Sequence, residues 1–208
     1  MNKKCVITIA RGFGSGGRTI GKALADELGI NYYDKELLKL VSQSTGINEQ
    51  MFSQVDEKLK GTVIWKVAQN VYRGENLGKQ NEDYAMNISM FNYTARVLTE
   101  IAERESCVVI GRCADYILRG NENVIRIFVH ASEDTCVRNV SEKSSMTDSE
   151  IRQFIEKTDR NRAEYYKYFT GGDWKDATNY DLCIDTDKMT VRQSIDVIKA
   201  YMKVRYMI

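Results

Sequence analysis

The sequence predicts an α/β fold in which helices flank a single parallel sheet. Five short runs rich in β-branched residues punctuate the 208-residue chain, and most are continuously apolar. Continuous apolar runs are typical of parallel strands that are buried on both faces. Segments with helical periodicity separate them, and strands that alternate with helices indicate a parallel α/β sheet. The chain length fits one substantial domain rather than two.

The residue pattern predicts the bounds of the first helix and of the five strands. A helix is predicted to begin near Arg18, with an apolar stripe that includes Ile20 and Leu24. It is expected to stop at Gly29, because glycine is favoured immediately after a helix. The five strands are expected over 5–10, 31–33, 107–111, 124–130 and 180–185.

Later helices are marked by periodicity and by capping residues. A long helix is expected from about 84 to 105. The pairs Thr147/Glu150 and Thr190/Gln193 have the spacing of capping boxes and predict the starts of two further helices. Between the second and third strands lie roughly seventy residues with helical periodicity, more than a crossover between parallel strands requires.

Composition excludes several classes of function. A formal net charge of +1 provides no strong field toward nucleic acid or an anionic membrane. No apolar run approaches the roughly 18–20 residues of a membrane span, and the apolar stretch after residues 1–4 is too short for a signal peptide. Five cysteines without zinc or C-x-x-C spacing favour reduced thiols and a cytoplasmic location. His130 is the only histidine, which disfavours Ser–His and multi-histidine metal chemistry.

The segment "GFGSGGRT" follows the first strand and opens the first helix. It matches the P-loop pattern G-x-x-x-x-G-K-[ST] at every fixed position except the lysine. Glycines allow successive backbone N–H groups to surround an anion, and the helix N-terminus adds positive potential. Thr19 stands where a hydroxyl binds Mg²⁺; the alternative is a glycine-rich turn that serves packing alone. The expected phosphate-binding residues are Gly12, Gly14, Ser15, Gly16, Gly17, Arg18 and Thr19.

Arg18 occupies the position of the P-loop lysine. Arginine keeps the positive charge but presents a planar fork on a longer arm, which can bind terminal phosphates with two nitrogens. Lys22, one helical turn later, is an alternative source of charge, although a solvated position on the helix surface explains it more simply.

Four segments together resemble the cytidylate kinase-like family of P-loop kinases. They are "GFGSGGRT", "VVIGRCADYIL", "IRIFVHASEDTCVRNV" and "DRNRAEYY…YDLCIDT". Their order and spacing cover most of the chain. The resemblance implies a P-loop NTPase-type core with a five-stranded parallel sheet, a helical NMP-binding insertion, a small lid, and ATP with Mg²⁺ as phosphoryl donor.

The same resemblance divides the chain. A single kinase domain is expected over 1–208, with its core formed by 1–34, 106–145 and 178–208. The helical insertion is expected over about 35–105 and the lid over about 146–177.

The resemblance also implies an acceptor pocket. Tyr33 and Asp34 match the strand-end residues beside the monophosphate, and Arg112 matches the arginine of an Asp-Gly-Arg-Asp motif. Asp115 is the nearest carboxylate to that motif and is expected to bind substrate or metal. The acids that flank the motif are absent, since Ile110 and Cys113 stand in their places.

A further departure lies at Leu40, where the family pattern has an arginine. The departures from the family pattern at Leu40, Ile110 and Cys113 leave the identity of the acceptor open.

Arginines after the fourth strand complete the implied site. Arg138 matches the arginine that approaches ATP, and Asp159, Arg160 and Arg162 resemble the Asp-x-x-Arg cluster of the lid. Mobile arginines would neutralise phosphate charge and exclude water on closure. The alternative is a solvated helix face with i,i+3 ion pairs. Aromatic residues that follow, including Trp174, are expected to anchor this segment to the core.

The resemblance therefore implies ATP-dependent phosphoryl transfer to a nucleoside monophosphate, with CMP or dCMP as the first candidate. The catalytic residues are expected to be Arg18, Arg112, Arg160 and Arg162. A kinase for another small acceptor and a nucleotide-binding module without turnover remain alternatives. Nucleic-acid and membrane partners are not expected, and the oligomeric state is left open.

Overall fold

The computed structural model contains a five-stranded parallel sheet, which confirms the predicted fold class. The structure describes residues 4–34, 37 and 80–206. The strand order is β2-β3-β1-β4-β5, and every neighbouring pair is parallel. The loop after the central strand β1 therefore opens onto the middle of the carboxyl edge, where open α/β sheets bind ligands. The strands are β1 (Val6–Arg11), β2 (Asn31–Tyr33), β3 (Cys107–Ile110), β4 (Val124–His130) and β5 (Leu182–Asp185).

The helices begin and end close to the predicted residues. Gly29 ends the first helix with a left-handed φ of 63°, and both predicted capping boxes form. The long central helix begins at Gln80, several residues earlier than its sequence pattern indicated. The helices are α1 (Gly17–Leu28), α5 (Gln80–Arg104), α6 (Ala114–Ile117), α7 (Glu133–Ser141), α8 (Asp148–Thr170), α9 (Val191–Tyr206) and a short 3₁₀ turn (Ala177–Asn179).

The fifth strand is shorter than predicted at its start. Tyr180 closes the 3₁₀ turn through a hydrogen bond from its N–H to Ala177 O (3.1 Å), so it does not join the sheet. Its ring is buried beside Phe128 instead. The sequence pattern of 180–185 thus reflects the burial of Tyr180 and of Ile184. The backbone hydrogen bonds decide that the strand begins only at Leu182.

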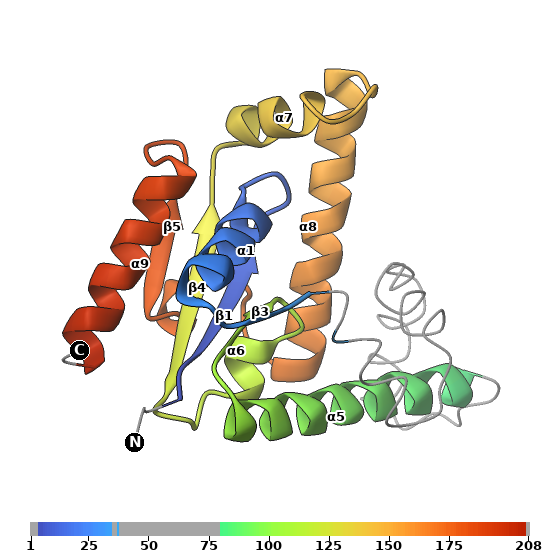
Figure 1. Cartoon of the computed structure of the whole chain (residues 1–208). Coiled ribbons are helices and arrows are strands. Elements are labelled where there is room, and N and C mark those ends of the chain that lie inside the picture. The colour runs from blue at the N-terminus through green and yellow to red at the C-terminus, as the bar shows by residue number, and fades with distance from the viewer. Residues whose placement is uncertain (1–3, 35–36, 38–79, 207–208) are drawn as a thin grey trace.

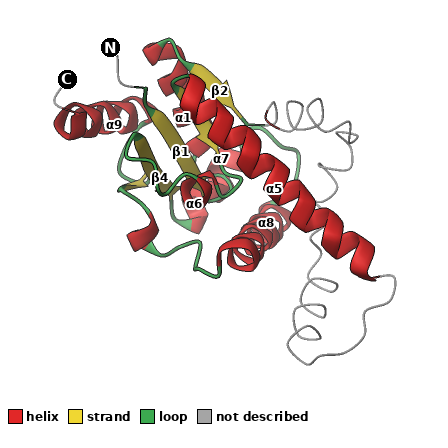
Figure 2. Ribbon diagram, turned by 90° about the horizontal axis from the view of Figure 1, so that it is seen from below, coloured by secondary structure: helices red, strands yellow, loops and turns green. Residues whose placement is uncertain are grey.

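Helices cover both faces of the sheet, as Figure 1 and Figure 2 show with α8 and α9 on opposite sides. Residues of α1 and α9 pack on one face, where Ile7 and Ile127 are among the fully buried residues. Residues of α5 and α6 pack on the other face. Helix α8 joins that second face through Tyr166, which is buried with Trp174. The predicted aromatic anchor of this segment is therefore confirmed.

The segment expected to form a lid contains one continuous helix, α8. The first half of α8 packs against α7, and its second half reaches the sheet. Its role as a lid, and the division into core, insertion and lid, stay predictions. Most of the expected insertion, including Leu40, lies outside the described residues. Across the described part of the chain, no helix is both long and apolar enough to cross a membrane.

Candidate phosphate-binding site

Two glycines of the loop between β1 and α1 have left-handed backbone conformations. Gly14 has φ 81° and Gly16 has φ 84°, values that side chains with a Cβ rarely adopt. A Cβ on Gly14 would lie 2.7 Å from the carbonyl oxygen of Cys136. The loop thus passes so close to α7 that position 14 requires glycine for space as well as for conformation.

Side chains from other elements hold the carbonyl oxygens of this loop. Asn139 Nδ2 donates to Gly14 O (2.8 Å), and Thr186 Oγ1 donates to Ser15 O (2.9 Å). The N–H and C=O of a trans peptide point in opposite directions. The N–H groups of Ser15 and Gly16 therefore point away from these two contacts, and that of Ser15 donates to Gly12 O at 3.4 Å. The first N–H groups of α1 also have no carbonyl one turn earlier to accept them, so the loop is suited to an anion.

Arg18 leaves the first turn of α1 and pairs with Asp34, at the end of β2. Arg18 Nε lies 2.8 Å from Asp34 Oδ2, and Nη2 donates to Oδ1 at 3.2 Å. The Arg18 side chain is half exposed, whereas that of Asp34 is 14% exposed. The structure thus unites a predicted donor-side residue with a predicted acceptor-side residue. It directs Arg18 toward the β2 side of the loop.

Two residues of α8 contact the loop directly. Asp159 Oδ1 accepts hydrogen bonds from Phe13 N (2.8 Å) and Arg162 Nη1 (2.9 Å). Arg162 also donates to Arg11 O at 3.0 Å, and its guanidinium lies 5.6 Å from the Phe13 ring centroid. Burial raises the pKa of Asp159, and the charge of Arg162 opposes that shift. The expected lid residues 159 and 162 therefore lie against the phosphate loop.

The end of β3 carries three consecutive left-handed residues. Gly111 has φ 68°, Arg112 φ 62° and Cys113 φ 52°. A left-handed conformation costs a non-glycine residue about 1–2 kcal/mol, and such strain concentrates at functional sites. This turn ends β3 and begins α6, which places Arg112 at the same sheet edge as the loop.

The missing acids of this segment have a structural explanation. Ile110 is 1% exposed and packs in the core beneath α1, while Cys113 is 5% exposed and packs beside Phe128. Apolar side chains occupy both positions, so a carboxylate there would be buried in an apolar cluster. The chain has therefore replaced the polar flanks of the motif with core residues.

Arg11 is a site residue that the sequence interpretation missed. It is the last residue of β1 and immediately precedes the loop. Its Nε atom is buried and has no hydrogen-bond partner among the described residues. Burial lowers the pKa of Arg11 to about 9; the charges of Arg162, Arg18 and Arg112 add to this shift, and Asp34 opposes it. A cation at the end of an apolar strand, directly before a glycine-rich loop, was the available signal.

The two expected metal ligands have different environments. Thr19 is exposed in the first turn of α1. Asp115 is 4% exposed, and its Oδ2 accepts a hydrogen bond from Tyr166 OH at 2.9 Å. Burial raises the pKa of Asp115, although the Tyr166 hydrogen bond lowers it. Asp115 thus links α6 to α8, and its contact with metal or substrate stays a prediction.

Three other predicted site residues make their described contacts with side chains outside the phosphate loop. Arg160 pairs with Glu156 on the exposed side of α8. The hydroxyl of Tyr33 donates to Glu105, which precedes β3 at the opposite edge of the sheet. Arg138 is exposed on α7, where its Nη2 donates to Thr135 Oγ1 at 3.0 Å. Their proposed roles remain predictions.

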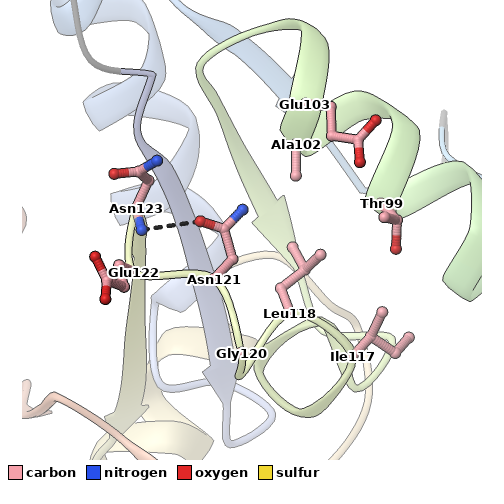
Figure 3. Close-up of a pocket in the computed structure, with 9 residues that line it drawn as sticks. All are labelled: Thr99, Ala102, Glu103, Ile117, Leu118, Gly120, Asn121, Glu122 and Asn123. Atoms are coloured by element: carbon pink, nitrogen blue, oxygen red, sulfur yellow. Dashed lines mark hydrogen bonds between the residues drawn. The ribbon is translucent and has the colours of Figure 1, made fainter.

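A hollow lies at the amino edge of the sheet, between the end of α5 and the loop that leads into β4 (Figure 3). Within it, Asn123 N donates to Asn121 Oδ1 at 2.9 Å. Parallel α/β sheets bind ligands at their carboxyl edge instead, where the loop and the arginines lie. The hollow is lined by Thr99, Ala102, Glu103, Ile117, Leu118, Gly120, Asn121, Glu122 and Asn123.

Comparisons with known proteins place the chain in a family. Residues 6–188 match the cytidylate kinase-like family. The cytidylate kinase of Methanosarcina mazei is 30% identical over 101 residues, which cover 48% of this chain and 56% of that protein. This match therefore spans a little over half of that relative. The cytidylate kinase of Methanopyrus kandleri is 22% identical over 204 residues, covering 94% of this chain and 91% of that protein.

Solved structures share the fold. An uncharacterized protein from Eubacterium ventriosum is 29% identical, with a TM-score of 0.68 over 96% of this chain and 99% of that chain. Shikimate kinase from Bacteroides thetaiotaomicron is 17% identical, with a TM-score of 0.52 over 96% of this chain and 98% of that chain. The phosphate loop and most of the chain lie within the family match, and the chain belongs to the cytidylate kinase-like family.

Proposed function

We propose that the chain is a P-loop kinase that transfers a phosphoryl group from ATP to a nucleoside monophosphate, with CMP or dCMP as the first candidate acceptor. The family and its two cytidylate kinase relatives support this class of reaction. The observation that carries the proposal is the group of arginines beside the loop. These are Arg11, Arg18, Arg112 and Arg162. Donor and acceptor phosphates together would bring the negative charge that this group requires.

Each part of the site has a role in this reaction. The N–H groups from Gly14 to Thr19 would hold the donor phosphates, while Arg112 and Arg162 would align donor and acceptor. The transition state spreads charge over the phosphoryl oxygens, so positioning and electrostatics do most of the catalytic work. A phosphate acceptor is already anionic and needs no general base. Asp34 would orient the acceptor through its position beside Arg18.

Magnesium ions bound to the donor phosphates would supply additional positive charge. The exposed hydroxyl of Thr19 suits such an ion, whereas Asp115 is engaged by Tyr166. No group of three or more His, Cys, Asp or Glu side chains that could hold a metal occurs in 4–34, 37 or 80–206. This fits an ion held mainly by substrate phosphates and water, as is common for Mg²⁺.

A kinase for a different small acceptor is the second candidate. The buried apolar side chains of Ile110 and Cys113 favour it, because they remove two polar groups that the family pattern places beside the acceptor. A nucleotide-binding module without turnover is the third, favoured by arginine at the lysine position. We also expect a cytoplasmic protein without nucleic-acid or membrane partners. None of the five cysteines, all of which the structure describes, is in a disulfide.

A coupled assay for ADP release tests these candidates. The purified chain with MgATP is offered CMP, dCMP, UMP, AMP, shikimate and gluconate in separate reactions. Turnover restricted to CMP or dCMP supports the proposal, and turnover with a non-nucleotide alone replaces it with the second candidate. Tight MgATP binding without turnover on any acceptor would favour the binding module.

A further inference from the structure

The side chain of Arg11 lies against two glycines, Gly17 beside its stem and Gly111 beside its guanidinium. A Cβ on Gly17 would lie 2.6 Å from Arg11 Cβ, so the start of α1 packs directly on the stem of this side chain. A Cβ on Gly111 would approach Arg11 Nη1 to well under 3.0 Å, a separation that real Cβ atoms essentially never show. The head of Arg11 therefore reaches from the end of β1 to the turn after β3.

No carboxylate forms an ion pair with this guanidinium in the described part of the chain. Its Nε atom is buried without a hydrogen-bond partner in the part of the chain that the structure describes. The charges that act on it are those of Arg162 from α8, Arg18 from α1, Arg112 after β3 and Asp34 after β2. Asp34 is already bound by Arg18 through two contacts. A buried arginine that served packing would normally be paired, because an unpaired buried charge is costly.

The two arginines that flank the loop therefore differ. Arg18 has a carboxylate partner and is half exposed. Arg11 has a buried Nε without a hydrogen-bond partner among the described residues, and three of the four charges that act on it are positive. The P-loop pattern assigns the contact with the terminal phosphates to the residue at position 18. The geometry favours Arg11 for that contact, because a triphosphate tail would supply the missing negative charge at its guanidinium.

We infer that Arg11 takes the place of the P-loop lysine and binds the terminal phosphates, in a slot that Gly17 and Gly111 keep open. Arg18 then serves the acceptor side together with Asp34. This assignment rests on the proposed binding of a nucleoside triphosphate at the loop. It does not depend on which acceptor the protein uses.

Calorimetric titration with inorganic tripolyphosphate, and separately with MgATP, tests the inference. R11M is expected to weaken tripolyphosphate binding by about 10- to 100-fold, the effect of losing a hydrogen bond to a charged group. R18M is expected to weaken it by at most about fivefold, since Arg18 is half exposed. R96M is the matched control, because Arg96 is an exposed residue of α5 paired with Glu100, and its binding should equal that of the wild type.

Thermal unfolding without ligand separates binding from structural support. R11M should unfold at or above the wild-type temperature, because it removes an uncompensated buried charge. It should also lose most of the stabilisation that tripolyphosphate gives the wild type. R11K keeps the charge on a shorter arm and should bind with intermediate affinity.

Two results would overturn the inference: wild-type affinity in R11M, or a clear loss of stability in unliganded R11M. Absence of tripolyphosphate and MgATP binding in the wild type would overturn it together with the proposed function. If no nucleoside monophosphate is turned over but binding still depends on Arg11, only the proposed function fails. If CMP is turned over while R11M and the wild type bind tripolyphosphate with equal affinity, only the inference fails.

Discussion

Substitution of Gly111 by alanine tests the slot at the end of β3. Gly111 has φ 68° and faces the buried guanidinium of Arg11. The left-handed backbone alone costs alanine about 1–2 kcal/mol. The added methyl group also overlaps Arg11 Nη1, and overpacking of this kind costs about 1–3 kcal/mol. We therefore expect G111A to lower the free energy of unfolding by about 2–5 kcal/mol.

Two other glycines separate these contributions. Gly29 also has a positive φ, 63°, but a Cβ there would meet nothing within 4 Å. G29A should therefore lower the free energy of unfolding only by the cost of the left-handed backbone, about 1–2 kcal/mol. Gly120 has neither a positive φ nor a close neighbour, so G120A should change stability by less than about 0.5 kcal/mol.

Urea unfolding followed by circular dichroism gives these free energies. For a chain of this size, about 2–4 °C of melting temperature corresponds to 1 kcal/mol, so calorimetry provides an independent check. In an R11A background the overlap disappears, and the cost of G111A should fall to that of G29A. If G111A costs no more than G29A in the wild type, Arg11 moves aside freely and the slot is not tightly packed.

Three further predictions concern neighbouring contacts. Asp159→Ala should lower the free energy of unfolding by about 1–3 kcal/mol in urea titrations, because it leaves the Phe13 N–H without its acceptor; unchanged stability would contradict that link. Asp115→Asn should stabilise the protein more at about pH 8 than at about pH 4. Burial raises the pKa of Asp115 in the folded state, so ionisation costs stability above that pKa and the cost is lost as pH falls through it; parallel pH profiles for mutant and wild type would show that Asp115 carries no such cost. The ratio of wild-type to R11M affinity for tripolyphosphate should be level below about pH 9 and fall above it, because burial lowers the pKa of Arg11 to about 9 and its neutral form has no charge for phosphate. The ratio cancels the protonation of tripolyphosphate itself, and a ratio that calorimetry finds unchanged above that pH would contradict this role of Arg11.

Local patterns determined the elements of this fold. The loop "GFGSGGRT" lies between a strand and a helix, as its position in the sequence predicts, and Gly14 and Gly16 have left-handed conformations there. The Thr147/Glu150 box opens α8 where its spacing placed it. Caps, glycine turns and apolar periodicity act over a few residues, so the sequence alone reveals them.

The orientation of the predicted site residues depends on tertiary packing and not on the local sequence. Arg160 and Arg162 both belonged to the expected cluster, yet Arg160 pairs with Glu156 in solvent while Arg162 contacts the loop. Successive helix residues are about 100° apart, so two residues separated by two positions face nearly opposite directions. Which one faces the loop depends on how α8 packs. Tyr33 shows the same dependence, because its hydroxyl reaches Glu105 at the other edge of the sheet.

What the sequence by itself determined is a phosphate loop on a five-stranded parallel sheet, together with a family. Only the tertiary structure decided that the guanidinium of Arg11, with its buried Nε, lies beside Gly111. Arg11 and Gly111 are a hundred positions apart, and parallel pairing of β1 with β3 brings them together. The Arg18–Asp34 pair depends likewise on β2 lying beside β3. Burial and counter-charge are properties of packed neighbours, and the strand order sets those neighbours.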